Sequence, residues 1–588
     1  MVIICHCFFT NCYKFILNCR LSASMKAFYL FCMAVFALVC SQSTNAALDR
    51  VGDFALLDNV GEFHQLSRYR HRKAMVLMAY DESCVTMPGL IDNFSELASE
   101  FSEAGLEFFL IDSLDLGRPR FTVEGFKFPV LEDDGQLVSG SLGIQNAGDV
   151  LVLNPERLSL YYRGSVSNEL QQTLARVAED AVNDTVTIPT NGCEISYLMK
   201  DAHAQSPPDY VKDVAPIIIE NCAECHKQGG VGPFALDSYI MMLGWSPMIR
   251  EVLLNKRMPP TQVDPYIGHS ENARYLTKKE LQTVIHWIDA GAPQGAVNSD
   301  PLEALGTLAG GAESDEWVLG EPDYIVTGPQ NDVPPTGVMD YLYANIELPF
   351  TEDKWVKAIQ YRAGDASVLH HLMTFVTAPD EDFWGAERNQ TSVTRRFVEG
   401  YSPGNLNVRE FSKGTGVFIP QGHRLSMQFH YVTNGQRTTD ETLLGLYFSD
   451  EEDLQEQLAQ AVSSRFVLPP NEPNHAMHAE HVFDEDVVLI GVRARMNYRG
   501  KKMKFAVEEA GGELREIFSV PAYNYGWQPH YILNQAEVIS AGTKVHVIGA
   551  FDNSVSNPTN PDPEKEIGFG LNSWDEMFTG YFTFYSAP

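Results

Sequence analysis

The chain has 588 residues and a formal net charge of −34 at pH 7, with 43 Lys and Arg against 77 Asp and Glu. Its length predicts about three to five domains. An acidic chain of this kind repels a phosphate backbone, so we expect no nucleic-acid partner.

Residues 1–46 have the pattern of a leader with a secretory signal peptide. Met25 and Lys26 precede an apolar run over residues 27–39, and small polar residues follow it. This run is too short for a permanent membrane helix, and no later apolar run has the required length. We therefore expect an exported protein, periplasmic or extracellular, without a transmembrane segment. Either Met1 or Met25 is the start of translation.

Residues 47–181 alternate short apolar strands with amphipathic helix, which predicts an α/β domain. Cys84 follows the first strand, where a helix N-terminus lowers a thiol pKa. This segment resembles the thioredoxin-like redoxin family, and the resemblance implies that Pro129 is cis and packs against the cysteine. Met87 stands where a C-x-x-C motif has its second thiol, so dithiol exchange within the turn is excluded. The sequence favours strands at 74–80, 106–111 and 150–153, and a helix at 90–104.

The cysteines outside the leader are few. Cys84 and Cys193 are the only ones that belong neither to the leader nor to the C-x-x-C-H motif described next. Cys193 lies in a polar linker, residues 182–208. The two form a redox-active pair or a plain structural disulfide, or each is an inert buried thiol.

A C-x-x-C-H motif follows at Cys222, Cys225 and His226. Two thiols and an adjacent imidazole at this spacing are what covalent attachment of haem c requires. Met258, in a loop with two prolines, offers a sixth iron ligand. A zinc knuckle or a structural disulfide is the alternative, but no second Cys or His pair stands at zinc spacing nearby.

The region around this motif, residues 209–297, resembles a small class I cytochrome c. A helix over 210–220 leads into the motif, the methionine loop follows, and a capping box at Thr277 and Glu280 opens a last helix. Residues 298–316 are rich in Gly, Ala and acid and are interpreted as a linker.

From residue 317 onward the period-two pattern of β-strands replaces helical periodicity. This half is long enough for two all-β sandwiches of jelly-roll type, at 317–467 and 468–588, with the boundary near Pro469 and Pro470. Strands are expected at 424–432, 487–498, 502–508 and 543–551.

Three histidines of the first sandwich are candidate metal ligands. His370 and His371 are adjacent, and His430 lies on the polar side of its strand. Three imidazoles suit copper, zinc or iron, but adjacent side chains on a regular strand point to opposite faces. A shared metal therefore requires a bend at the His pair. A structural role is the alternative.

Five stretches in order make this half resemble the copper type II, ascorbate-dependent monooxygenases, the peptidylglycine and dopamine hydroxylating group. The resemblance implies two separated coppers. His370, His371 and His430 match the electron-supplying site, and Met577 matches the methionine of the catalytic site, where oxygen binds. The five stretches are residues 368–373, 428–431, 496–501, 552–563 and 575–577.

The His-x-His pair of that second site is replaced here by Arg495 and Asn497. Arginine cannot ligate a metal and asparagine is a poor copper ligand, so the second copper is in doubt. Other histidines either rebuild the site with Met577 or are hydrated surface groups. They are His475, His478, His481, His530 and His546.

Three functional hypotheses follow. The first is an exported, copper-dependent monooxygenase-like redox protein, in which covalently bound haem c relays electrons from an external donor and a small molecule or peptide is the substrate. The second is a non-hydroxylating copper and haem electron-transfer or copper-handling protein with a degenerate second copper site. The third, weaker one is a structural or interaction protein with vestigial sites.

Overall fold

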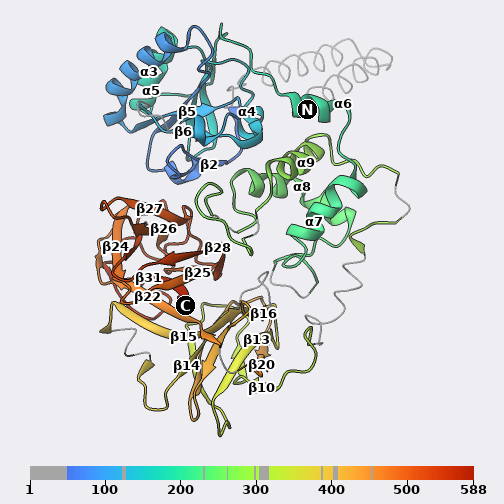
Figure 1. The fold of residues 1–588 in the computed structure, drawn as a ribbon. Helices are drawn as coiled ribbons and strands as arrows, with labels where there is room; N and C mark the ends of the chain where they lie inside the picture. The colour runs from blue at the N-terminus through green and yellow to red at the C-terminus, as the bar shows by residue number, and fades with distance from the viewer. Residues whose placement is uncertain are drawn as a thin grey trace, which may run out of the picture.

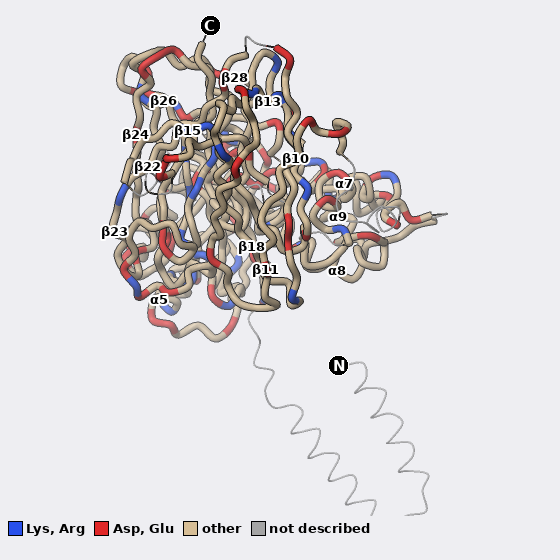
Figure 2. The backbone as a smooth tube through the Cα atoms, turned by 90° about the horizontal axis from the view of Figure 1, so that it is seen from below, with Lys and Arg blue, Asp and Glu red and all other residues tan. Residues whose placement is uncertain are grey.

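The computed structural model (Figure 1) describes residues 49–587 except for 122–126, 229–231, 261–262, 274, 297–298, 304–316, 384, 386–388, 402–407 and 452–453. The predicted leader and most of the predicted linker at 298–316 lie outside the described residues. Within the described part of the chain, no helix combines the length and apolar character needed to cross a membrane. Asp and Glu positions, coloured red, occur throughout the described part of the tube in Figure 2.

The N-terminal domain is built on a sheet with strand order β1-β8-β7-β4-β5-β6, and β9 pairs with β8. β4, β5 and β6 are parallel neighbours, whereas β7 pairs antiparallel with both β4 and β8. A helix connects β4 to β5 and another follows β8, so the order is that of a thioredoxin-like fold and the predicted α/β class is confirmed. The strands are β1 (Asp49–Arg50), β4 (Ala74–Ala79), β5 (Leu106–Asp112), β6 (Val130–Glu132), β7 (Val150–Asn154), β8 (Ser159–Gly164) and β9 (Val186–Thr187), and β2 (Ala55–Leu57) pairs with β3 (Phe63–Gln65).

Both faces of this sheet are buried. Val76 and Met78 of β4 pack with the helices α3 and α5, whereas Met75 and Leu77 face the opposite side. This alternation explains the continuous apolar run of β4, because a strand covered on both faces has no polar side. The helices are α3 (Met87–Phe101), α4 (Leu137–Leu142) and α5 (Asn168–Ala178), with short turns η1 (Leu66–Tyr69), η2 (Ser102–Ala104), η3 (Arg118–Arg120) and η4 (Asp134–Gln136).

The expectation for Pro129 is wrong. The cis peptide bond of the described residues is Met258–Pro259, and Pro129 precedes the edge strand β6. β4 has β5 on one side and β7 on the other, and Gly148 and Asp149 precede β7. The strand that follows Pro129 is thus separated from β4 by β5.

The helices between the two halves of the chain lie beside the N-terminal domain (Figure 1) and share an apolar core with the second face of its sheet. Val214, Ile218 and Trp287 belong to the same apolar core as Leu77 of β4. The predicted capping box is present, since Thr277 and Glu280 each accept from the other's backbone N–H at the start of α9. The helices are α6 (Leu198–Gln205), the π-helix η5 (Tyr210–Val214), α7 (Ala215–Asn221), α8 (Tyr239–Leu254) and α9 (Lys278–Asp289).

The C-terminal half consists of β-sheets, as predicted. A six-stranded sheet, β10-β20-β13-β17-β21 with β16 beside β13, shares a core with the β14 and β18 part of an eight-stranded sheet. A four-stranded sheet, β24-β29-β26-β27, shares a second core with the β25 and β31 part. The eight-stranded order is β12-β18-β14-β15-β22-β31-β25-β28, so the β15–β22 pairing joins the two sandwiches.

The strands of the first sandwich are β10 (Tyr324–Thr327), β11 (Asn331–Val333), β12 (Leu342–Glu347), β13 (Lys354–Arg362), β14 (Leu369–Thr377), β15 (Ser392–Tyr401), β16 (Val408–Glu410), β17 (Thr415–Ile419), β18 (Arg424–Tyr431), β19 (Thr438–Asp440), β20 (Leu443–Phe448) and β21 (Gln455–Glu456). Those that follow are β22 (Leu458–Ser464), β23 (Val467–Leu468), β24 (His475–Val482), β25 (Val487–Arg495), β26 (Gly500–Glu508), β27 (Leu514–Val520), β28 (Tyr531–Ile539), β29 (Lys544–Phe551), β30 (Ile567–Gly568) and β31 (Phe578–Ser586).

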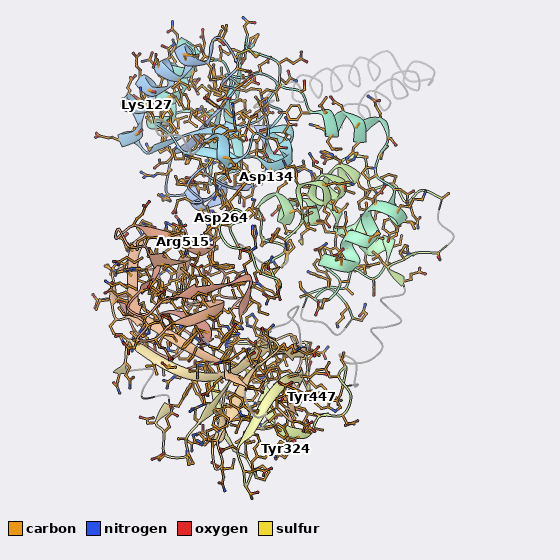
Figure 3. All side chains as sticks on the ribbon, in the orientation of Figure 1. Lys127, Asp134, Asp264, Tyr324, Tyr447 and Arg515 are labelled. Atoms are coloured by element: carbon orange, nitrogen blue, oxygen red, sulfur yellow. A yellow bond between two sulfur atoms is a disulfide. The ribbon has the colours of Figure 1, made fainter. Side chains whose placement is uncertain are left out.

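A buried ionic junction ties the three parts together. Arg118 of the N-terminal domain donates to Glu132 and to Asp264, each at 2.7 Å. Asp264 belongs to the loop that follows Met258, and its N–H donates to the carbonyl of Ser519 in the second sandwich at 3.1 Å. Figure 3 shows Asp264 between the N-terminal domain and that sandwich. The loop is thus held from both sides.

Candidate functional site

The C-x-x-C-H motif follows the end of α7 and lines an apolar cavity of about 440 Å³. Cys222, Cys225 and His226 line one part of the cavity, and Met258 lines another. Part of the remaining wall consists of aliphatic side chains of α7 and α8, such as Ile218 and Leu253. A cavity of this size and character is typical of cofactor sites.

The side chain of His226 is held in one orientation. Its Nδ1 lies 2.9 Å from the carbonyl oxygen of Phe234, and because a carbonyl only accepts, Nδ1 carries the proton. The other ring nitrogen, Nε2, then has a free lone pair for a metal. Phe234 itself stacks on Trp245 at 4.1 Å between ring centroids, which fixes the carbonyl.

The two cysteines of the motif are not joined in a disulfide. Burial raises the pKa of the Cys222 thiol to about 12, so its sulfur is uncharged at neutral pH. Attachment of haem would turn both thiols into thioethers, which are neutral sulfurs and need no buried charge in this apolar cavity. The thiols, the oriented imidazole and the apolar cavity together fit a covalently bound haem.

The same cavity reaches the β-sandwiches. His370 lines it together with Asn524, Gly526 and Trp527, all of which come from the C-terminal half of the chain. The Trp527 indole N–H is buried and has no hydrogen-bond partner among the described residues. His370 is therefore shared between the cavity of the C-x-x-C-H motif and the histidine cluster of the first sandwich.

That cluster forms because β14 has a bulge. Leu369 pairs with Tyr431 and His371 pairs with His430, so the register shifts by one residue at His370. A bulge turns one side chain toward the face of its neighbour, which is the bend that the sequence required. The ring centroids of His370, His371 and His430 lie 5.0 to 5.4 Å from one another.

The cluster has unused nitrogen atoms. His371 Nε2 and His430 Nδ1 are buried without a hydrogen-bond partner in the described part of the chain, and His370 Nδ1 lies 3.1 Å from His371 Nδ1. Burial lowers the pKa of His370 to about 4 and that of His430 to about 3. Neutral imidazoles with free lone pairs suit a late first-row metal such as copper.

Two tyrosines that the sequence did not single out complete this site. The Tyr341 ring lies 5.0 Å from that of His430, and its hydroxyl is 3.2 Å from the hydroxyl of Tyr525. The Tyr525 hydroxyl lies 3.4 Å from His430 Nε2. Neither residue belongs to a recognisable motif, so no sequence signal pointed to them.

Arg495 occupies the position where the second copper was expected. Its Nε donates to Met577 Sδ at 3.1 Å, and its terminal nitrogens donate to Met373 Sδ and Gln428 Oε1. The side chain is 4% exposed and lies over the Tyr341 ring, 5.4 Å from its centroid. A fixed cation therefore sits against the sulfur that would bind copper.

The side chain of Asn497 makes structural hydrogen bonds instead of facing a metal. Its side-chain amide donates to the carbonyls of Asn572 and Asp575 at 3.1 and 3.0 Å, which anchors the loop that carries Met577. Its backbone N–H donates to Glu576. Asn497 thus shapes the second site without offering it a ligand.

The other histidines do not rebuild this site. The described residues around Met577 include no histidine. His530 lies between Glu399 and Thr583, and His481 contacts Ser392. His478 contacts His546, and both belong to the four-stranded sheet.

Cys84 and Cys193 form a disulfide, with 5.8 Å between their Cα atoms. The chain around Cys193 runs beside the loop that precedes β7, where Ala147 N–H donates to the Cys193 carbonyl at 2.8 Å. Cys84 is buried, and Met87 begins α3 just after it. The linker thereby covers the turn in which a redoxin has its reactive thiol.

Comparisons with known proteins are limited to the N-terminal quarter. No family model matches the chain, and no curated protein is similar to it. An uncharacterized conserved protein from Geobacillus kaustophilus is 20% identical with a TM-score of 0.24, covering 26% of this chain and 91% of its own. A peroxidoxin from Mycobacterium tuberculosis is 22% identical with a TM-score of 0.19, covering 23% and 96%. A thiol:disulfide interchange protein from Bacteroides sp. is 13% identical with a TM-score of 0.19, covering 23% and 90%.

Proposed function

We propose that this chain is an exported redox protein that exchanges electrons between a covalently bound haem c and one copper ion. Cys222, Cys225 and His226 would hold the haem, with Met258 as a candidate sixth ligand. His370, His371 and His430 would hold the copper. Bound in this way, the two groups supply one-electron chemistry.

The observation that carries the proposal is the position of His370. It belongs to the histidine cluster and lines the cavity of the C-x-x-C-H motif as well. His370 would thus be a ligand of the copper and a wall residue of the haem cavity at once, with Trp527 in the same wall. The chain's part is to hold the two sites next to one another.

Arg495 favours the non-hydroxylating alternative over the monooxygenase-like one. A hydroxylating member of the resembled family needs a second copper on Met577, and the guanidinium opposes a cation at that sulfur. The export part of the proposal is supported by the leader pattern and by the Cys84–Cys193 disulfide, since disulfides persist in oxidising compartments. The N-terminal domain would be an accessory thiol module.

The test follows the haem after a single-electron reduction. In protein loaded with haem and Cu(II), the haem is reduced by a flash and its optical band is followed together with the Cu(II) spin resonance signal. We expect the absorption band of the reduced haem to decay while the Cu(II) signal falls, because the electron passes from the haem to the copper.

His430→Ala should abolish copper binding and leave the reduced haem long-lived, while the haem itself stays attached. His475→Ala is the matched control, since His475 lies on β24 in the second sandwich, away from the cluster. Equal lifetimes of reduced haem in the wild type and in His430→Ala would overturn the proposal. So would two coppers per chain with one bound through Met577.

A further inference from the structure

The outer face of the four-stranded sheet carries a second group of metal-binding side chains. Glu480 on β24 lies directly opposite His546 on β29, and His478 lies two residues before Glu480 on the same face. This face is turned away from the apolar core, which Met477 and Ala479 of the same strand enter. The two histidines and the carboxylate therefore meet at the surface of the sheet.

Their ligand atoms are already close together. His478 Nε2 lies 2.8 Å from His546 Nδ1, and one carboxylate oxygen of Glu480 lies 3.9 Å from His546 Nδ1. All three ligand atoms are within 4.8 Å of one another. His546 is 4% exposed, whereas His478 and Glu480 reach solvent, so the group has a fixed base and an open side.

A second carboxylate orients the buried imidazole. Glu508 on β26 accepts from His546 Nε2 at 3.2 Å. This contact places the ring proton on Nε2 and leaves the Nδ1 lone pair directed at His478 and Glu480. Metal-ligating histidines in proteins have this same arrangement, in which the outer nitrogen donates to a carboxylate.

We propose that His478, Glu480 and His546 form a metal site on this sheet, which binds a divalent transition ion of the Zn²⁺ type. Two imidazoles and one carboxylate, with one position open to solvent, are a ligand set that Zn²⁺ adopts. The ion replaces the proton that the two imidazoles share in the 2.8 Å contact. The site is built on other strands than the three-histidine cluster and does not depend on the proposed function.

Lys544 competes with the ion. Its ammonium lies 3.3 Å from Glu480 and 3.8 Å from Glu508. A positive charge at this distance weakens the binding of a second cation. Removing it should therefore tighten metal binding, which a purely structural network of ion pairs would not do.

The experiment uses the full chain with haem attached, in a His430→Ala background that removes the competing histidine cluster. Zn²⁺ is titrated against a chromophoric chelator. We expect one saturable site, whose affinity falls at least about tenfold in His478→Ala and in Glu480→Gln. Lys544→Met should raise the affinity by a similar factor.

His475→Ala is the control, because His475 is on the same strand and has its side chain on the opposite face. No saturable Zn²⁺ binding, or equal affinity in His478→Ala and in its parent, would overturn the proposal. His478 is exposed, so its removal leaves the core intact. Reoxidation of the haem by copper should be the same in the single variant His478→Ala as in the wild type, which separates this test from that of the proposed function.

Discussion

Replacing Arg495 by leucine removes the buried cation from the methionine pocket while keeping the pocket apolar. Met577 Sδ and Met373 Sδ then lose their donor, and Gln428 Oε1 is left beside them. Thioether sulfurs are soft ligands that prefer Cu(I). We expect Arg495→Leu to bind Cu(I) in this pocket, where the wild type does not.

The size of the effect follows from the geometry. Arg495 Nε is 3.1 Å from Met577 Sδ, so an ion bound to that sulfur lies close to the guanidinium. Two unit charges about 4 Å apart repel by about 4 kcal/mol at an effective dielectric constant of about 20. Removing the charge should therefore raise the affinity for Cu(I) about a thousandfold.

The affinity is measured by competition with a chromophoric Cu(I) chelator, with His430→Ala present in every variant to remove the first site. Arg495→Lys is the matched control, because it keeps the charge but loses the fork of donors. A thermal melt checks that each variant folds, since Gln428 loses a partner at a cost of about 1–3 kcal/mol.

The reasoning fails if Arg495→Leu and Arg495→Lys both bind Cu(I) with the same affinity. In that case the charge of Arg495 is not what keeps copper out of the pocket. Failure of both to bind would show instead that the two sulfurs are badly placed for a metal.

Three further predictions concern other parts of the chain. The copper-free protein should lose a few kcal/mol of stability as the pH falls from about 6.5 towards 3, because burial lowers the folded-state pKa of His430 to about 3 and unfolding then takes up a proton; urea titrations across this range measure it, and a flat profile contradicts it. Replacing Cys84 and Cys193 by serine opens a loop of 109 residues and should cost about 3–5 kcal/mol, read from the shift of the thermal midpoint against the disulfide-bonded wild type. Gly232→Ala should abolish haem attachment, because its Cβ would lie 2.8 Å from His226 Nδ1; a haem stain of the denatured protein decides, and normal staining would show that the loop can move.

Local chemistry was predictable from the sequence, and the relations between distant segments were not. The capping box at Thr277 and the α/β alternation around β4 depend on neighbouring residues, so they were found. The cis peptide bond expected at Pro129 is absent, because the strand after this proline is β6, which pairs with β5, whereas β7 pairs with β4. Strand pairing is a long-range property that a single sequence does not encode at one position.

The candidate site shows the same division. The adjacent pair His370 and His371 required a bend, but only the pairing of β14 with β18 shows where the bulge lies. Nothing near Trp527 indicated that it lines the cavity with His370, and nothing near Tyr341 indicated that it contacts His430, since both are far from these histidines in the chain. The metal group at Glu480 was missed for the same reason, because its third member is on another strand.

The junction at Asp264 has a kinetic consequence. Most small electron carriers must find their partner by diffusion, so their transfer rate depends on concentration and on salt. Here the loop after Met258 is held by Arg118 on one side and by the Ser519 carbonyl on the other. Transfer between groups bound in this chain would be a first-order event, unaffected by dilution, and the carrier would be permanently docked to its acceptor.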